Sequence, residues 1–256
     1  MKIAISGKGG VGKSTLAAAL ALLLARQGRK VLAVDADPDS NLAACLGMPE
    51  AKRKTIVPIS KQTALVEERT GAVPGRYGQT FRINPEVSDL SERFAVLQDG
   101  VALLVLGAVE KGGGGCACPE NVLIRALVAD LVLFRNEDLI MDMEAGVEHL
   151  GRGTASGVET LVVVIEPGRR SIETAHRISR LAGEIGLRNI RTVANKVDGP
   201  RDEAFVRAAF PENQLLGVIP YSEELRSADR TGGSVLDGLD GKLTGTFEAI
   251  LRRLQS

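Results

Sequence analysis

A glycine-rich stretch near the start of the chain carries the clearest chemistry in the sequence. It runs from Gly7 to Thr15 and reads Gly-Lys-Gly-Gly-Val-Gly-Lys-Ser-Thr. Glycines let the backbone turn tightly enough to aim successive N–H groups at one phosphate, and a helix start adds the positive end of its dipole. In such a pattern the lysine reaches the β- and γ-phosphates and the serine hydroxyl binds Mg²⁺. The residues predicted to bind the nucleotide are Gly9, Gly10, Val11, Gly12, Lys13, Ser14 and Thr15, with Ser14 also on Mg²⁺.

The flanks of this loop are those that phosphate binding requires. An apolar run at 3–5 predicts a strand before the loop, and the Ala- and Leu-rich run at 16–25 predicts a helix after it. The alternative is an ordinary glycine turn between a strand and a helix. The spacing, the lysine and both flanks together favour the phosphate-binding interpretation.

Carboxylates follow two further apolar runs. Asp35 and Asp37 come directly after a β-branched run, and Asp142 ends another run two residues before an Ala-Gly pair. The carboxyl ends of parallel strands are where open α/β sheets bind ligands. Paired with a phosphate loop, an apolar strand ending in aspartate predicts that Asp142 holds Mg²⁺ through water. Gly146 then brings a backbone N–H to the γ-phosphate.

Two cysteines lie close together in an unusual setting. Cys116 and Cys118 follow four consecutive glycines and precede Pro119, which suits the first turn of a helix. Two thiolates at this spacing can bind one soft metal ion, and the helix start favours thiolate over thiol. A tetrahedral site needs four ligands, and a second copy of the chain could supply the other pair across a two-fold axis. A pair of loop cysteines without a role is the alternative, whereas Cys45 in an apolar run is predicted to pack in the core.

The order of elements predicts one α/β domain over residues 1–256. Strand-like runs alternate with helical ones, which is typical of a mostly parallel twisted sheet with helices on both faces. Residues 47–100 depart from this pattern, and we interpret them as an insertion or cap on the sheet. We expect a helix at 61–70 and a short extended pair near 80–84 there. Further strands are predicted at 101–105, 160–165, 191–194 and 215–220, and further helices at 121–135, 171–186 and 243–254.

Composition excludes several classes of protein. Lys and Arg total 32, as do Asp and Glu, so no electrostatic argument favours nucleic acid as a partner. No apolar stretch is long enough to span a membrane, and no signal peptide is evident. The three cysteines make no disulfide framework. We therefore expect a cytoplasmic protein without a nucleic-acid or membrane partner.

Lys8, directly after the first glycine, makes the loop resemble that of the MinD/ParA/nitrogenase-iron-protein group of deviant Walker A ATPases. In that group the early lysine reaches across a dimer to the nucleotide of the partner subunit. The resemblance implies that Asp37 orients or activates the attacking water and that Asp35 lies near the metal. It also implies that Asn195, in the run Asn-Lys-Val-Asp, binds the adenine, and that the loop from Pro220 closes over the base. Lys8, Lys13 and Asp37 are the implied catalytic residues.

Within this group the chain resembles, essentially end to end, the CooC family of carbon monoxide dehydrogenase maturation ATPases. The motifs that carry the resemblance are Gly114-x-Cys116-x-Cys118-x-Glu120-Asn121, Asp142-Met143-x-Ala145-Gly146-x-Glu148-His149-Leu150, Val164-Ile165-Glu166-Pro167, Asn195-Lys196-Val197 and Leu216-Gly217-Val218-Ile219-Pro220-Tyr221. One departure is Glu144, where a small residue is expected.

This resemblance implies an ATP-dependent nickel metallochaperone that works as a homodimer. Cys116 and Cys118 of two subunits would hold one ion, and hydrolysis would deliver nickel to a carbon monoxide dehydrogenase or an acetyl-CoA synthase. Zinc suits the same thiolates, so ligand type does not decide the metal. Two rival interpretations remain: a ParA/MinD-like positioning ATPase, which gives no reason for the cysteines, and an iron–sulfur carrier, whose ligand cysteines lie far apart in sequence.

Overall fold

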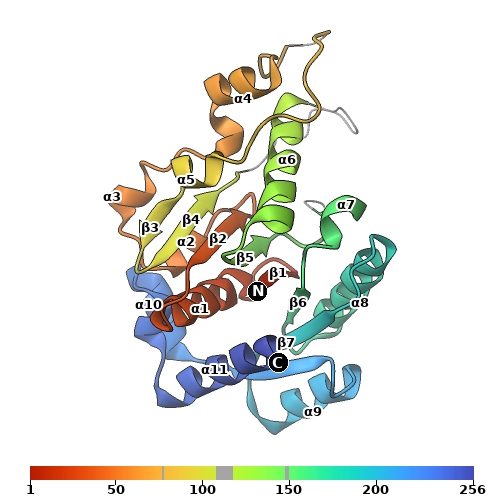
Figure 1. Cartoon of the computed structure of the whole chain (residues 1–256). Helices are drawn as coiled ribbons and strands as arrows, with labels where there is room; N and C mark the ends of the chain where they lie inside the picture. Colours follow the sequence, from red (N-terminus) through yellow and green to blue (C-terminus); the bar gives the residue numbers. More distant parts are fainter. Residues whose placement is uncertain (77, 108–117, 148–149) are drawn as a thin grey trace.

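The computed structural model describes residues 1–76, 78–107, 118–147 and 150–256. Within them, an eight-stranded sheet has the strand order β3-β4-β2-β5-β1-β6-β7-β8 (Figure 1). Neighbouring strands run parallel, except that β3 is antiparallel to β4. The strands are β1 (Lys2–Gly7), β2 (Val31–Ala36), β3 (Val96–Gln98), β4 (Val101–Val105), β5 (Asp138–Met143), β6 (Thr160–Ile165), β7 (Ile190–Val197) and β8 (Leu215–Pro220). The predicted fold class, a single α/β domain with a mostly parallel sheet, is confirmed.

Helices cover both faces of this sheet. On one face, α1 (Lys13–Arg26) packs beside α11 (Gly241–Gln255), and on the other lie α6 (Pro119–Phe134) and α8 (Arg169–Glu184) (Figure 1). The remaining helices are short: α2 (Leu42–Cys45), α3 (Glu50–Arg53), η1 (Ile59–Lys61), α4 (Thr63–Thr70), α5 (Leu90–Phe94), α7 (Arg152–Ala155), α9 (Gly199–Ala209), α10 (Glu223–Thr231) and η2 (Val235–Gly238). No helix in the described part of the chain is long and apolar enough to cross a bilayer.

The core has two layers, one on each face of the sheet. Leu20 of α1 and Phe247 of α11 belong to one layer, and Leu127 of α6 and Met141 of β5 belong to the other. Strands buried on both faces are apolar on both faces, which explains why they read as continuous apolar runs rather than alternating ones. The apolar stripe of the last helix covers the sheet, as the sequence predicts.

Residues 47–100 wrap around the β3–β4 edge of the sheet. Met48 packs in the layer of α1, whereas Ile59 packs in the layer of α6, so the chain changes face between them. At this crossing the Ser60 N–H donates to the Leu106 carbonyl at 2.9 Å, and the Leu106 N–H donates to the Asp35 carbonyl at 2.9 Å. A backbone ladder therefore joins the crossing to the end of β2.

One part of this segment differs from its prediction. The helix expected at 61–70 is confirmed as α4, but no strand forms near 80–84 among the described residues. The Arg82 N–H instead donates to the Thr70 carbonyl at 2.8 Å, which attaches this stretch to the end of α4. The extended pairing lies later in the chain. After β3 the backbone turns through Asp99, a residue with φ of 46°, and β4 then pairs antiparallel with β3.

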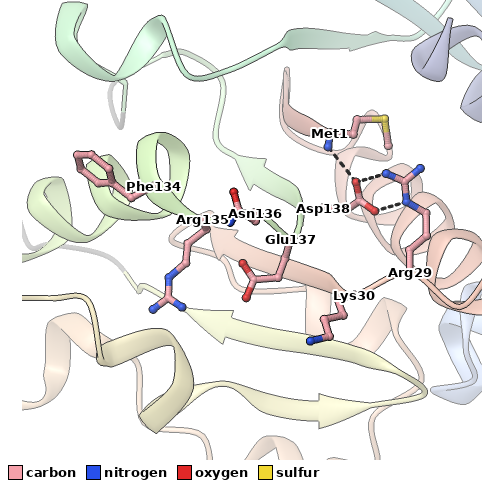
Figure 2. Close-up of a pocket in the computed structure, with 8 residues that line it drawn as sticks. All are labelled: Met1, Arg29, Lys30, Phe134, Arg135, Asn136, Glu137 and Asp138. Carbon is pink, nitrogen blue, oxygen red and sulfur yellow. Dashed lines mark hydrogen bonds and ion pairs between the residues drawn. The ribbon is translucent and has the colours of Figure 1, made fainter.

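A buried acid lies at the amino end of the central strand β5. Asp138, the first residue of β5, is 4% exposed. Its Oδ1 accepts from the Met1 ammonium at 2.9 Å and from Arg29 Nη2 at 2.6 Å, and its Oδ2 accepts from Arg29 Nε (Figure 2). Both carboxylate oxygens therefore have cationic partners. This cluster ties the start of the chain and the end of α1 to the central strand.

Candidate nucleotide and metal site

The phosphate loop joins β1 to α1 and depends on glycine at defined positions. Gly10 and Gly12 have φ of 80° and 97°, a left-handed region that favours glycine. A Cβ on Gly12 would lie 2.2 Å from Asn195 Nδ2, and a Cβ on Gly7 would lie 2.4 Å from the Val164 carbonyl oxygen. The backbone path and its close neighbours therefore both exclude larger residues.

Lys13 is nearly buried at the first turn of α1 and already has an anionic partner. Its Nζ lies 3.3 Å from Asp37 Oδ2, and the Lys13 side chain is 7% exposed. The structure thus brings together two residues predicted to be catalytic. A phosphate group at Lys13 would compete with Asp37 for the ammonium. Lys8, the third, is exposed on the loop.

Asp35 and Asp142 sit side by side at the ends of β2 and β5, where they are register partners. Asp35 accepts from the Leu42 N–H at 3.1 Å and from the Asp37 N–H at 3.3 Å. Burial nevertheless raises its pKa from the ordinary 3.8 to about 6, because the two N–H groups offset desolvation only in part.

Asp142 is fully buried, and neither of its carboxylate oxygens has a hydrogen-bond partner. Burial raises its pKa from 3.8 to about 7; Ser14 and Lys13 lower it in part, and the Asp35 charge raises it further. A buried carboxylate without a donor is unfavourable unless a cation completes its environment. These residues fit Mg²⁺, which prefers oxygen ligands and neighbouring phosphates.

Two residues of β7 donate hydrogen bonds to the backbone of the phosphate loop. Asn195 Nδ2 donates to the Val11 carbonyl at 2.8 Å. Lys196 has φ of 57°, and its Nζ donates to the Gly10 carbonyl and to Glu166 Oε1, both at 2.6 Å. Asn195 therefore contacts the phosphate loop through its amide nitrogen. Lys196 belongs to the sequence motif Asn195-Lys196-Val197, but the motif did not predict its contact with the loop.

A small hollow lies beside the start of α1, between α2 and α10. It is lined by Thr15, Cys45, Leu225, Asp229 and Val235 among others. Helix α10 forms one wall of this hollow. Pro220 ends β8 and leads into α10, so this wall directly follows the loop that was predicted to close over the base. Burial raises the pKa of the Cys45 thiol to about 12, which suits the predicted packing role rather than a reactive one.

Of the predicted soft-metal ligands, Cys118 is described and Cys116 lies outside the described residues. Cys118 precedes α6, which begins at Pro119 as expected, and it is half-buried. The helix start was predicted to favour the thiolate of Cys118, but in the single chain the pKa of this thiol is raised, which favours the neutral thiol. Burial and the nearby Glu120 carboxylate raise the pKa of Cys118, although the Asn121 N–H lowers it. The described residues contain no group of three or more potential metal ligands.

The site combines a glycine-rich phosphate loop, a lysine paired with Asp37, and buried aspartates at the ends of parallel strands. This combination defines a P-loop ATPase. Residues 2–235 match the family described as the CobQ/CobB/MinD/ParA nucleotide binding domain. The chain belongs to this family and is an ATPase, as the sequence predicts.

Two curated relatives cover almost the whole chain. The carbon monoxide dehydrogenase accessory protein CooC of Rhodospirillum rubrum is 46% identical over 237 residues, which are 93% of this chain and 90% of that protein. An uncharacterized ATP-binding protein of Methanocaldococcus jannaschii is 43% identical over 253 residues, 98% of this chain and 96% of its own length. The match to CooC confirms the resemblance given by the sequence motifs.

Solved structures extend the likeness in fold. The MinD cell division protein of Aquifex aeolicus has a TM-score of 0.66 at 24% identity, covering 100% of this chain and 97% of that one. MinD of Pyrococcus horikoshii, complexed with Mg-ADP, has a TM-score of 0.66 at 20% identity, covering 98% and 94%. At these identities the comparison shows the shared fold alone.

Proposed function

We propose that the chain is an ATP-dependent nickel-insertion factor that matures a carbon monoxide dehydrogenase. The observation that carries this proposal is the 46% identity with a carbon monoxide dehydrogenase accessory protein over 93% of the chain. The cysteine pair gives a chemical reason for it, since two thiolates suit a soft or borderline cation. An acetyl-CoA synthase is the alternative client.

ATP would bind with its phosphates in the loop. Backbone N–H groups of residues 9–12 and the start of α1 provide the cradle, and Lys13 provides the charge. Ser14, Asp35 and Asp142 would hold Mg²⁺, for which the unpartnered oxygens of Asp142 leave room. When bound, Mg²⁺ neutralises charge on the β- and γ-phosphate oxygens. Asn195 and the loop from Pro220 would contact the base.

Hydrolysis would convert ATP and water to ADP and phosphate. The 3.3 Å pair between Lys13 and Asp37 supports an order of events. Triphosphate takes over Lys13, which frees the Asp37 carboxylate to orient the attacking water. Lys8, exposed on the loop, would reach the nucleotide of a second subunit, so that bound ATP favours a homodimer.

Nickel is the cargo in this proposal. Cys116 and Cys118 of each subunit would share one ion, with zinc as a competitor for the same thiolates. An ion held by two subunits is bound tightly only while both are present. A change in nucleotide state that separates the subunits therefore weakens metal binding and favours delivery. Residues 47–100 would act as a cap on the β3–β4 edge of the sheet.

The test is anaerobic sizing with metal analysis, with and without Ni²⁺ and without nucleotide. We expect the wild type to become a dimer with half an equivalent of nickel per chain. The double variant Cys116→Ala/Cys118→Ala should stay monomeric, and the matched control Cys45→Ala should behave as wild type. Wild type that neither binds metal nor changes mass would overturn the metallochaperone proposal and leave a dimerising ATPase of unknown cargo.

A positioning ATPase of the MinD/ParA kind is the weaker alternative. The shared fold does not separate the two, because the matched structures share it at under 25% identity. The last helix, α11, buries Phe247 and Leu251 against the sheet, so this apolar face is already covered. Net charge is zero over the whole sequence, which gives no support for a nucleic-acid surface.

A further inference from the structure

A serine buried in β1 makes contacts that the nucleotide site as described does not use. Ser6 immediately precedes Gly7, the first residue of the phosphate loop, and it is 0% exposed. The strand residues before it, Ala4 and Ile5, are apolar core residues. A hydroxyl in such a strand needs buried hydrogen-bond partners.

Within the described residues, the hydroxyl of Ser6 bonds to the loop that follows β5, residues 144–146, which we call the second-switch loop. Ser6 Oγ lies 2.8 Å from the Glu144 carbonyl oxygen and 2.8 Å from the Gly146 carbonyl oxygen, both of which can accept its proton. The same Oγ accepts from the Gly146 N–H at 3.1 Å. One side chain therefore binds both ends of the loop.

The N–H of Gly146 is fully engaged by these contacts. It also donates to the Glu144 carbonyl at 2.8 Å, so two acceptors share it. The sequence predicts that this N–H approaches the γ-phosphate, which ADP lacks. A γ-phosphate oxygen and Ser6 Oγ are therefore competing acceptors for one donor.

We propose that Ser6 is a positioning residue that holds the second-switch loop with the Gly146 N–H directed at the Ser6 hydroxyl, so that γ-phosphate binding must displace this hydroxyl. This inference rests on the proposed ATPase mechanism and extends it. Ser6 lowers the preference of the free protein for ATP over ADP. Ser6 directly precedes the phosphate loop in β1. The same strand therefore leads into the loop and carries the hydroxyl that holds residues 144–146.

The test compares the affinities of a non-hydrolysable ATP analogue and of ADP, each with Mg²⁺, by calorimetric titration. Ser6→Ala removes the hydroxyl and should tighten analogue binding by about 3- to 10-fold, the effect of one hydrogen bond, while ADP affinity stays unchanged. Ser6→Thr keeps the hydroxyl and should retain the wild-type ratio. An unchanged ratio in Ser6→Ala, or an equal change for both nucleotides, would show a merely structural role and overturn the inference.

A measurement on the wild type keeps the test independent of how well the variants fold. The backbone amide resonance of Gly146 should stay in place with Mg-ADP and move with the Mg-bound analogue. The same resonance position in both complexes contradicts the inference. Wild type that hydrolyses ATP but fails these tests leaves the proposed function intact, whereas wild type that binds neither nucleotide overturns both.

Discussion

Strand β5 carries a buried aspartate at each end, and the two differ in how they are partnered. Asp138 begins the strand with both carboxylate oxygens bound to cationic groups, the Met1 ammonium and Arg29. Asp142 lies near the other end with neither oxygen hydrogen-bonded, and burial raises its pKa to about 7. Both are nearly inaccessible to solvent, so burial alone does not distinguish them.

The difference shows what each carboxylate does. When the chain supplies all the partners of a buried charge, removing that charge leaves the partners uncompensated and destabilises the fold. A buried charge without partners makes the unliganded fold less stable and gives a cation a reason to bind. The amino end of β5 therefore holds a structural ion cluster, and its carboxyl end holds the carboxylate that we propose binds Mg²⁺.

The largest expected effect is on hydrolysis. Asp142→Asn should lower the ATPase rate by about 100-fold, because the amide no longer supplies the negative charge that orients Mg²⁺ through its water. Asp138→Asn, the matched change at the other end of the strand, should leave the rate per folded molecule within about twofold. Steady-state phosphate release measures both. Equal losses in the two variants would remove the functional distinction between the ends of β5.

The second prediction is that the two substitutions, Asp138→Asn and Asp142→Asn, change the stability of the fold in opposite directions. At pH 8, without nucleotide or Mg²⁺, Asp138→Asn should lower the free energy of unfolding by about 2 kcal/mol, because charged hydrogen bonds to Arg29 are lost. Asp142→Asn should raise it by about 1 kcal/mol, because an unpartnered buried charge becomes neutral. Urea unfolding followed by circular dichroism measures both changes. Destabilisation of similar size in the two variants would contradict the comparison.

A smaller effect is expected from pH. The folded pKa values of Asp35 and Asp142, about 6 and about 7, lie above the ordinary 3.8. The folded state without metal therefore binds more protons, and its stability should fall as pH rises from about 4 to about 7. Mg²⁺ requires the ionised carboxylates, so the extra stability conferred by Mg-ADP should grow over the upper part of this range.

Melting temperatures between pH 5.5 and 8, with and without Mg-ADP, check this prediction. Asp142→Asn should lose the part of the pH dependence near 7 and keep the part near 6 that belongs to Asp35. Identical profiles for wild type and Asp142→Asn would show that Asp142 does not titrate in this range.

The sequence predicts most of the fold because the central strands are buried on both faces and the phosphate loop has a fixed pattern. It did not predict β3, a three-residue edge strand with no periodicity to detect. It placed extended structure near 80–84, where Arg82 instead bonds to the end of α4. Local pattern does not reveal which distant backbone a short polar stretch will meet.

The residues of the site also divide into those that local motifs reveal and those whose roles depend on distant contacts. Lys13, Asp35, Asp37 and Asp142 could be located from motifs, and the structure brings them together. The roles of Ser6 and Lys196 could not be predicted, because they depend on backbone groups more than a hundred residues away. The raised pKa of Cys118 was also missed, since burial outweighs the helix start there.

The hydrogen bond from the Leu106 N–H to the Asp35 carbonyl has a consequence for communication within the molecule. Leu106 is followed by Gly107, the last described residue before the cysteine-bearing segment. Under the proposed function, a nucleotide that changed the position of Asp35 would act through this one hydrogen bond on the residues that directly precede the segment. Coupling between two ligands is reciprocal, so under the proposed function a metal ion held by the cysteines would alter nucleotide affinity by the same factor. The proposed coupling would therefore need no separate relay domain.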